Sequence, residues 1–354
     1  MDRGLPKVSV IIVSWNARPL LERFLPGVVA TDYPDLEIIL ADNASEDDSV
    51  AWVQSNCPDV QIVRHDANYA FCGGNNLAFP YASGKYVVFL NNDIEVERDW
   101  LTPLIACLEE DDSIAAAQPK ILSQKKKNTF EYAGAAGGFM DQYGYPFARG
   151  RVFSTVEKDT GQYDTQSDVF WATGAAIALR RSALESVGLF DESFVMHMEE
   201  IDLCWRLHRA GYRVVCHPTS RVYHVGAASL TESSPRKAYL NFRNNLLTLY
   251  KNLSPRAWRR CFAARVCFDL LATVRALAIG RPREALASVR AYRDALAMRH
   301  RYSDVRPDND SLPLFYRRSI VFDYYLRGRR RFSDLAADRL PLFRTPEKAG
   351  SRLT

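Results

Sequence analysis

The chain has 354 residues, 47% of them hydrophobic, which supports a substantial core in one large domain with an appendage or in two domains. It contains no run of 18 uncharged apolar residues and no N-terminal apolar segment of secretory length, so we expect neither an ordinary membrane span nor a signal peptide. The seven cysteines form no CxxC pair and no metal-type spacing, which predicts reduced thiols in a cytoplasmic protein.

The net charge of +4 combines two regions of opposite sign. Residues 1–228 carry 20 Lys and Arg against 31 Asp and Glu, a net charge of −11, whereas residues 229–354 carry 26 against 11, a net charge of +15. This asymmetry predicts an acidic body and a basic tail directed at an anionic partner. A membrane surface and nucleic acid are the two candidates. We expect no nucleic-acid partner, because the sequence has no recognisable nucleic-acid-binding motif.

The first part of the chain alternates short apolar runs with helical segments. The apolar runs predict strands at 8–13, 36–40, 60–63 and 85–90. Helices are expected between them at 19–30, 47–55 and 75–82, and residues 65–76 are expected to form a loop rich in Gly and Asn. This alternation predicts an α/β fold, Rossmann-like, with a mostly parallel central sheet and flanking helices.

The pattern becomes less regular after residue 110. Residues 123–165 are polar, aromatic and interrupted by glycines, which predicts a long excursion rather than part of the core. Regular elements are expected on both sides of this segment. They are strands at 114–121, 170–179, 212–216 and 222–224, and helices at 100–110, 181–187 and 199–210.

Beyond residue 229 the pattern changes to long helices with a proline at or near each start, expected at 235–252, 255–279 and 282–299. Residues 261–280 are mostly apolar but carry Arg265, Asp269 and Arg275, too many charges for a comfortable membrane span. We interpret this segment as a basic amphipathic helix lying in the headgroup plane of a membrane. Packing against the body or in a homodimer, with the arginines solvated, is the alternative.

Polar side chains follow three of the predicted strands at the point where each strand ends. They are Ser14-Trp15-Asn16, Asp42-Asn43 and Asn91-Asn92-Asp93. Parallel strands place their carboxyl ends along one edge, where ligands of open α/β sheets bind. Oxygen ligands there suit a divalent cation that holds a substrate phosphate, and Asp42 can accept hydrogen bonds from a base or a ribose. The same residue types also form ordinary turns and helix caps.

Two further segments supply candidates. Asn68 and Gly73-Gly74-Asn75-Asn76 permit close approach of the backbone to a ligand, although they do not form a GxGxxG fingerprint. Glu199, Glu200 and Asp202 stand at the start of a predicted helix, where the helix dipole favours carboxylates. Three crowded acids beside apolar neighbours are also a good source of a general base, because they raise one another's pKa.

Taken together, these segments resemble family 2 glycosyltransferases with a GT-A fold, of the bacterial rhamnosyltransferase-like subgroup. The resemblance covers about 220 residues in the family's order. The matching segments are VSVIIVSWN (8–16), ADNAS (41–45), NYAFCGGNN (68–76), FLNNDIEV (89–96), WATGAAIALRRS (171–182), FDESFVMHMEEIDLCWRLHRAGYRV (190–214) and VYHVGAAS (222–229).

The resemblance implies roles for these residues. Asp93 matches the last acid of the family's DxD-type motif, which holds Mg2+ or Mn2+ against a diphosphate, and His224 matches a histidine that often completes that metal site. Trp171 and Gly174 match the loop that lines the sugar and the acceptor. The nucleotide-sugar would be bound by Ser14, Trp15, Asn16, Asp42, Asn43, Asn68, Gly74, Asn75, Asn92 and Asp93.

The motif that supplies the base usually reads Glu-Asp in the family and reads Glu199-Glu200 here. Glu200 fills the usual Asp position with one more methylene, so we favour Glu200 as the base, with Glu199 as the alternative and Asp202 as a third catalytic candidate. Asn91 and Asn92 replace acids found in some relatives. One side-chain carboxylate would therefore carry the metal, with His224, phosphate oxygens and water completing its shell.

The resemblance implies an inverting, metal-dependent transferase that moves a sugar from a nucleotide-diphosphate donor to a glycan. The subgroup favours dTDP-rhamnose, with UDP- and GDP-sugars left open. We expect a lipid-linked acceptor at the inner face of the cytoplasmic membrane. The alternatives are a lipid-phosphate or protein acceptor, or a non-catalytic sugar-binding or scaffold homologue. Residues 1–228 would form the catalytic domain, and residues 229–354 a basic helical region for membrane-surface or oligomer contact.

Overall fold

A mixed central sheet of nine strands organises the computed structural model, which describes residues 5–226, 234–308 and 316–335. Strands β3, β2, β1 and β4 follow one another in the sheet and run parallel. Between consecutive strands of this group the chain forms a helix, as the sequence predicts for an α/β fold. The strands are β1 (Val8–Ser14), β2 (Leu36–Asp42), β3 (Gln61–Arg64) and β4 (Tyr86–Leu90); the helices are α1 (Arg18–Val29), α2 (Ser49–Asn56) and α3 (Ala70–Ala78), followed by the 3-10 turn η1 (Phe79–Tyr81).

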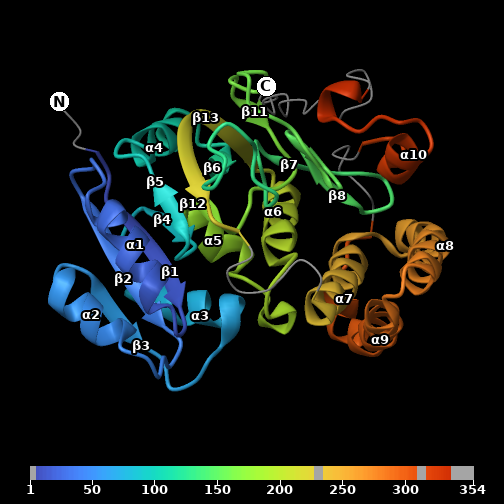
Figure 1. Ribbon diagram of the computed structural model, residues 1–354, viewed down its shortest axis with the longest axis horizontal. Helices are drawn as coiled ribbons and strands as arrows, with labels where there is room; N and C mark the ends of the chain where they lie inside the picture. The colour runs from blue at the N-terminus through green and yellow to red at the C-terminus, as the bar shows by residue number, and fades with distance from the viewer. Residues whose placement is uncertain (1–4, 227–233, 309–315, 336–354) are drawn as a thin grey trace, which may run out of the picture.

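The rest of the sheet is built from later strands. Strand β12 (Ala176–Arg180) lies antiparallel between β4 and β6 (Ile114–Ser123), and β13 (Arg213–His224) runs parallel to β6. Two short strands, β5 (Ile94–Val96) and β11 (Ser167–Asp168), pair antiparallel with β13. Helices cover the sheet on both sides (Figure 1), including α4 (Leu101–Glu110), α5 (Arg181–Val187) and α6 (Glu199–Arg209).

Burial explains why the central strands read as continuous apolar runs. Every residue of β4 is buried, and all of β1 is buried except Val13, because helices pack against both faces of the sheet. One strand differs from its prediction. Strand β13 is continuous, although two separate pieces were expected, because a register shift against β6 between His217 and Arg221 takes up the intervening Pro218-Thr219-Ser220.

Helix α3 begins at Ala70, five residues before the predicted start at 75. The expected loop at 65–76 is therefore mostly helical, and Gly73 and Gly74 lie inside the helix. Glycine disfavours a helix interior by up to about 1 kcal/mol relative to alanine, which is why the pattern predicts a loop. Close packing of this helix against the strand ends outweighs that preference.

The segment 123–165 is not an irregular excursion outside the core, as the sequence suggested. It contains a second, four-stranded antiparallel sheet, and Phe139, Met140 and Phe147 are buried in it. The strands are too short to give a period-two signal, and turns separate them. They are β7 (Gly138–Met140), β8 (Pro146–Ala148), β9 (Arg151–Val152) and β10 (Thr155–Val156).

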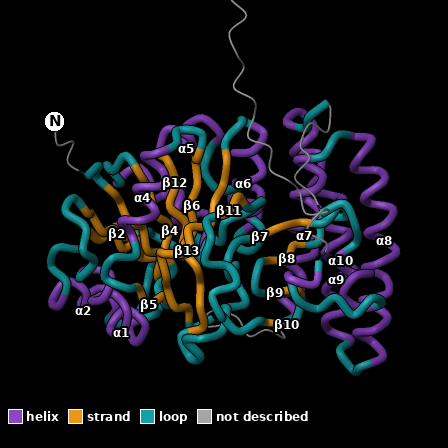
Figure 2. Tube along the Cα trace, turned by 90° about the horizontal axis from the view of Figure 1, so that it is seen from above, coloured by secondary structure: helices purple, strands orange, loops and turns teal. Residues whose placement is uncertain are grey.

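The C-terminal helices lie together at the end of the molecule opposite β2 and β3 (Figures 1 and 2). They are α7 (Pro235–Asn252), α8 (Pro255–Ala278) and α9 (Pro282–Met298), close to their predicted bounds, followed by η3 (Arg299–Val305), α10 (Ile320–Tyr325) and η4 (Phe332–Asp334). In the described part of the chain, none of the helices has the length and apolar character needed to cross a bilayer. One sequence-based expectation is wrong here: Arg265 is buried rather than at the surface, because Asp269 neutralises it inside the bundle.

Candidate active site

The carboxyl ends of β1 and β2 are joined by hydrogen bonds. The backbone N–H of Asn43 donates to the carbonyl of Ser14 at 2.8 Å. Asn16 adopts a left-handed conformation with φ of 47°, and its side chain accepts from the N–H of Glu46 at 2.7 Å. Asp42 is buried at this junction, and Trp15 stands beside it with 53% of its surface exposed. Four of the predicted nucleotide-binding residues therefore share one edge with an exposed aromatic ring.

Helix α3 packs directly on this edge. The Asn43 side chain donates to the carbonyl of Ala70 at 2.9 Å, and a Cβ atom on Gly74 would lie 2.8 Å from Asn43 Oδ1. Asn68 and Asn75 serve the helix itself, because Asn68 accepts from the Ala70 N–H at 2.9 Å and the buried Asn75 donates to the Phe71 carbonyl at 2.9 Å. Gly74 thus has no room for a side chain.

His65, which follows β3 at the same edge, was not among the residues that the sequence indicated. Its Nδ1 lies 2.9 Å from Asn43 Oδ1, and its Nε2 is buried without a hydrogen-bond partner. Burial lowers the pKa of His65, so its neutral form is favoured. Because Asn43 Oδ1 is an acceptor, Nδ1 of a neutral His65 donates to it, which leaves Nε2 able only to accept a hydrogen bond from a ligand.

The end of β4 brings the third group of predicted residues to this edge. Asn92 donates to the hydroxyl of Ser14 at 3.3 Å. Asp93 is buried, and its Oδ1 lies 3.1 Å from Nε2 of His224. The contact depends on the pairing of β5 with β13, in which Ile94 stands opposite His224. The two residues assigned to a metal by the sequence are therefore neighbours.

Glu131 is a third member of this group that the sequence did not indicate. It comes from the 123–165 segment, and its Oε2 lies 3.3 Å from His224 Nδ1. Burial acts to lower the pKa of His224, but the two carboxylates, Asp93 and Glu131, raise it to about 10. A protonated His224 therefore pairs with two buried carboxylates, and its single positive charge offsets one of their two negative charges.

The chemistry of this donor set fits a cation shared with a substrate. Mg2+ and Mn2+ prefer oxygen ligands and are held in many enzymes by one or two protein groups plus substrate phosphates. Asp93 and His224 supply such a pair, and Glu131 stands behind the imidazole as its orienting carboxylate. Across the described ranges, no group of three or more His, Cys, Asp or Glu side chains is arranged to hold a metal without further ligands.

A strained turn places Glu199 and Glu200 at the start of α6. Val195, His197 and Met198 all have positive φ angles, of 68°, 69° and 75°. Such conformations cost about 1–3 kcal/mol each and persist only where the surroundings hold them. Asn244 of α7 does so, because its side-chain amide donates to the carbonyls of Phe194, Met196 and His197 at 2.8–2.9 Å.

The two glutamates are in a low-dielectric environment and each keeps one oxygen without a hydrogen-bond partner. Burial raises the pKa of Glu200 to about 7. Glu199 is the more buried of the two by surface exposure, and burial together with the charge of Glu200 raises its pKa well above the usual range. Glu200 can therefore exchange a proton near neutral pH, whereas Glu199 holds its proton more tightly.

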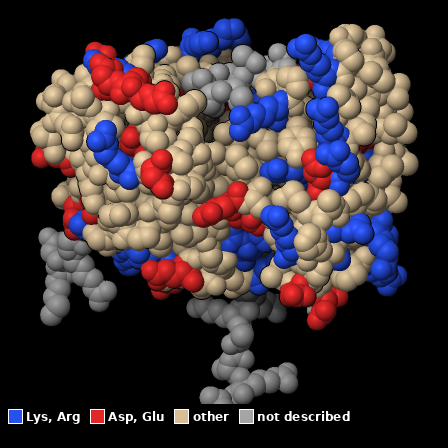
Figure 3. Space-filling model, turned by 90° about the horizontal axis from the view of Figure 1, so that it is seen from below, with Lys and Arg blue, Asp and Glu red and all other residues tan. Residues whose placement is uncertain are grey.

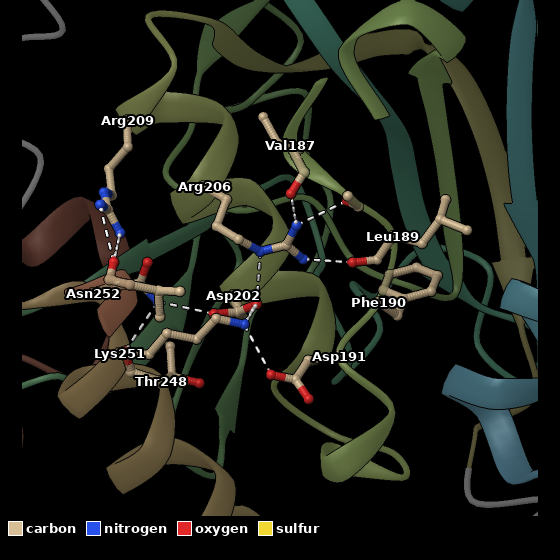
Figure 4. Close-up of polar contacts among 12 residues, drawn as sticks. Val187, Leu189, Phe190, Asp191, Asp202, Arg206, Arg209, Thr248, Lys251 and Asn252 are labelled. Carbon is tan, nitrogen blue, oxygen red and sulfur yellow. Dashed lines mark hydrogen bonds and ion pairs between the residues drawn. The ribbon is translucent and has the colours of Figure 1, made fainter. Parts of the chain in front are cut away.

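Asp202, the third candidate, has a different environment (Figure 4). It is fully buried, and its Oδ2 lies 2.9 Å from both Arg206 Nε and Lys251 Nζ. Its Oδ1 accepts from the side-chain amide of Asn252 at 2.9 Å. Both oxygens are thus engaged by partners on α6 and α7, so we place Asp202 in the support of helix α6 rather than among the reacting groups.

The loop before β12 lies between the Glu199–Glu200 pair and the end of β4, which carries Asp93. A Cβ on Gly174 would lie 3.7 Å from the Glu200 Cβ, and the next residue, Ala175, accepts from the N–H of Asn91 at 2.9 Å. Gly174 therefore lies between Glu200 and the end of β4 that carries Asp93. Trp171 is buried in the same loop, where its indole donates to the Phe139 carbonyl at 2.9 Å.

The chain is similar to several known proteins. It is 31% identical to the O-antigen biosynthesis protein RfbC of Myxococcus xanthus over 67% of this chain and 19% of that protein. It is 26% identical to the N-acetylglucosaminyl-diphospho-decaprenol L-rhamnosyltransferase of Mycobacterium tuberculosis over 63% of this chain and 77% of that enzyme. The match thus spans only about a fifth of the length of RfbC.

A solved structure shares the fold. The mannosyltransferase PcManGT from Pyrobaculum calidifontis, in complex with GDP-Man and Mn2+, is 17% identical, with a TM-score of 0.52 over 83% of this chain and 88% of that one. The expected GT-A architecture, a Rossmann-like sheet with flanking helices, is confirmed by this likeness. The model of the family described as Glycosyl transferase family 2 matches residues 9–188, half of the sequence. The chain therefore belongs to glycosyl transferase family 2.

Proposed function

We propose that this protein is a metal-dependent glycosyltransferase that moves a sugar from a nucleotide-diphosphate donor to a glycan acceptor with inversion at the anomeric carbon. The single observation that carries the proposal is the meeting of Asp93 with His224 at the edge where β1, β2 and β4 end. Ligands of open α/β sheets bind at such an edge. Membership of the family supports the same reaction class.

The donor nucleotide would lie against the ends of β1 and β2. Asp42 and Asn43 would accept and donate hydrogen bonds to base and ribose, with His65 beside them. Trp15 offers an exposed ring on which a base can stack. Gly74 would support the donor site indirectly, because the absence of a Cβ lets α3 pack against the side chain of Asn43.

The diphosphate would reach the Asp93–His224 pair, where these two side chains would hold Mn2+ or Mg2+. When bound, the cation supplies positive charge that stabilises the departing nucleoside diphosphate. The fold relative PcManGT, which carries Mn2+ with its GDP-Man, supports this assignment. Glu131 would keep His224 in the orientation that presents Nε2 toward Asp93.

Glu200 would act as the general base. Its pKa near 7 leaves a large deprotonated fraction at neutral pH, and its unpartnered oxygen is free to take the proton of an acceptor hydroxyl as that oxygen attacks the sugar. Direct attack by the acceptor on the face opposite the diphosphate inverts the configuration. Glu199 remains the alternative base, although its higher pKa makes it the weaker candidate at neutral pH.

The names of two relatives support a proposal for the acceptor and the sugar. The mycobacterial relative is named for transfer of L-rhamnose to a decaprenyl-diphosphate saccharide, and RfbC is named for O-antigen biosynthesis. We therefore propose rhamnose from dTDP-rhamnose as the transferred sugar. The acceptor would be a lipid-linked saccharide in cell-surface polysaccharide synthesis, used by a protein bound to the inner face of the cytoplasmic membrane.

Donor binding and turnover test the proposal directly. The melting temperature of the full chain is measured with dTDP-, UDP- and GDP-sugars, with and without Mn2+, because a ligand of the native state raises it. We expect one sugar nucleotide to raise it only when Mn2+ is present. Asp93→Ala should abolish that shift and donor hydrolysis, whereas Asp99→Ala, at an exposed position, should retain both. Unchanged turnover in Asp93→Ala would refute the metal assignment.

A further inference from the structure

Helix α8 has a buried ion pair on its inward face. Arg265 and Asp269 are buried against the rest of the protein and form an ion pair at 2.9 Å. The hydroxyls of Tyr145 and Tyr292 each donate to Asp269 at 2.6 Å, and Arg265 donates to the Asn245 side chain at 2.7 Å. This network satisfies both charges, so the inward face of α8 carries a buried ion pair beside the apolar Trp258 and Cys261.

The opposite face of α8 is aliphatic and open to solvent. We call Val266, Leu270, Leu271, Val274 and Leu277 the α8 outer face; their exposed fractions lie between 40% and 68%. Spacings of three and four residues put four of them in one stripe along the helix, about 17 Å long at 1.5 Å per residue. Exposed aliphatic residues normally occur singly on a soluble surface, so a continuous stripe indicates a contact site.

Neighbouring helices also expose apolar side chains. Phe268 of α8 packs against Phe322 of α10, with ring centroids 5.5 Å apart. Phe322, Tyr325 and Leu326 of α10 are themselves exposed, as are Leu286 and Val289 of α9.

Arginines flank the α8 outer face at both ends. Arg256, Arg259 and Arg260 are exposed at the N-terminal end of α8, and Arg275, Arg281 and Arg283 at the C-terminal end. Figure 3 shows Lys and Arg side chains gathered over the side of the molecule that carries the C-terminal helices, beside tan surface. Asp269 is the only carboxylate in the α8 sequence, and it is buried. The charged side chains that α8 presents outward are therefore all cationic, and they stand beside exposed aliphatic residues.

This combination distinguishes a membrane from a second copy of the chain. A two-fold dimer through the α8 outer face would bring the same arginines of both copies to one interface, with no carboxylate of α8 to pair with them. In an anionic bilayer, the aliphatic stripe would lie among the acyl chains, and the arginines would meet lipid phosphates. The charge of the face therefore complements anionic lipid and opposes self-association.

We propose that the α8 outer face inserts into the surface of an anionic bilayer, with α8 lying parallel to the membrane plane and its flanking arginines on lipid headgroups. The biological purpose of this contact, which is to hold the active site near a lipid-linked acceptor, rests on the proposed function. The membrane contact itself is built from α8 residues that touch none of the reacting groups.

A native cysteine makes the contact measurable. Cys267 of α8 is exposed to solvent, whereas the other six cysteines are buried. A polarity-sensitive fluorophore attached to Cys267 of the full chain should shift to shorter wavelength with vesicles of phosphatidylcholine and phosphatidylglycerol, and much less with phosphatidylcholine alone. Cys267→Ser provides the labelling control, since it should take up no dye under native conditions.

A paired variant tests the face without altering the site. Leu270→Gln with Leu271→Gln should lower vesicle partitioning of the unlabelled chain by about tenfold or more in co-sedimentation, because each leucine leaving the acyl region forfeits several buried CH2 groups. The same change at the exposed Leu5, before β1, and Val29, at the end of α1, should leave partitioning unchanged, because α1 and β1 lie away from the C-terminal helices (Figure 1). Both variants should keep the melting temperature and lipid-free donor hydrolysis of the wild type.

Two results would overturn the proposal. One is equal partitioning of the Leu270/Leu271 variant and the wild type. The other is a lipid-free dimer, seen by analytical ultracentrifugation, that the same variant converts to monomer, because the face would then serve a second copy. If the wild-type protein did not hydrolyse any donor, the proposed function would be contradicted instead. Failure of the membrane proposal can therefore be told apart from failure of the proposed function.

Discussion

Glu199 and Glu200 are adjacent, but their surroundings give them different protonation states. Both are desolvated, yet Glu199 is the more buried side chain and also feels the charge of its neighbour, so its pKa is raised further. At neutral pH the pair therefore keeps one proton and exchanges a second, and the more exposed Glu200 is better placed to take up a proton from an acceptor. Two neighbouring carboxyls with separated pKa values are a common basis for a single competent base.

The pH profile of transfer follows from this difference. Because the base must be deprotonated and burial raises the Glu200 pKa to about 7, kcat/KM should increase as pH rises through about 7 and level off above it. Glu200→Gln should lower kcat by about 10²–10⁴-fold and remove this dependence. Glu199→Gln resembles a protonated Glu199 and should retain the rise. The reverse assignment of the two variants would identify Glu199 as the base.

Glu131 should act on the metal through His224. It contacts the imidazole nitrogen that faces away from Asp93, a position where an orienting carboxylate strengthens metal binding. We expect Glu131→Gln to weaken Mn2+ binding by about 10–100-fold in isothermal titration. Glu157→Gln is the matched control, because Glu157 is equally buried but bonds Tyr163 instead. Equal affinities in the two variants would exclude an orienting role for Glu131.

At this scale, the sequence identified residues that belong to local motifs and missed those contributed by distant segments. Asp93 and His224 were paired through the resemblance, and strand pairing brings them to 3.1 Å. Glu131 has no sequence signal, because only the fold of the 123–165 segment carries it to His224. Asp202 was grouped with Glu199 and Glu200 by spacing, but spacing along one helix does not reveal that α7 engages its carboxylate.

Asp202 connects helix α6 to α7, so loss of its carboxylate charge should lower the stability of the protein. Arg206 and Lys251 both pair with this buried carboxylate, so Asp202→Asn would leave two cations with weakened partners. Breaking a buried pair costs about 3–5 kcal/mol, which predicts a clear fall in melting temperature. Asp112→Asn, at a side chain 96% exposed, should change it little. Lost activity with an unchanged melting temperature would return Asp202 to the catalytic residues.

The approach of α3 to the strand ends is the element-scale feature that sequence patterns could not give. Glycines favour loops in isolation, so residues 73–74 predicted a break, whereas packing against Asn43 requires a residue without a Cβ inside the helix. The small strands β7–β10 were missed for a related reason. Each has only two or three residues, so burial in the second sheet, rather than any periodic pattern, defines them.

Two glycine variants separate packing from helix propensity. Gly74→Ala would place a Cβ 2.8 Å from Asn43 Oδ1 and should displace that side chain, raising KM for the donor more than it lowers kcat. Gly27→Ala, in α1, meets no atom within 4 Å and should stabilise the protein by about 0.5–1 kcal/mol. Steady-state kinetics and thermal unfolding check both. An unchanged donor KM in Gly74→Ala would mean that Asn43 does not contact the donor.

For the whole molecule, the change of charge at residue 229 does not coincide with a break in packing. Leu246 and Leu247 of α7 belong to the same buried apolar cluster as Phe89 of the central sheet, and so do Tyr316 and Ile320. Asn244 also holds the turn that carries Glu199. The sequence predicted the helices of the C-terminal region from local patterns. It did not predict that these helices pack against the central domain and hold the turn before Glu199, because those contacts join segments far apart in the chain.

The opposite charges of the two regions should orient the protein on a membrane. An anionic bilayer attracts the region beyond residue 228, with its net charge of +15, and repels residues 1–228, with −11. Because salt screens exposed charges, partitioning onto anionic vesicles should fall steeply between about 0.05 and 0.5 M salt, where the Debye length shortens from roughly 14 to 4 Å. Partitioning should not vanish at high salt, since the α8 outer face contributes apolar binding that salt does not weaken.

Replacing Arg259, Arg260 and Arg275 with Gln should flatten the salt dependence in co-sedimentation and leave that residual part of the binding. A residual part that disappears with the arginines would mean that binding is purely electrostatic and that the aliphatic stripe stays outside the lipid.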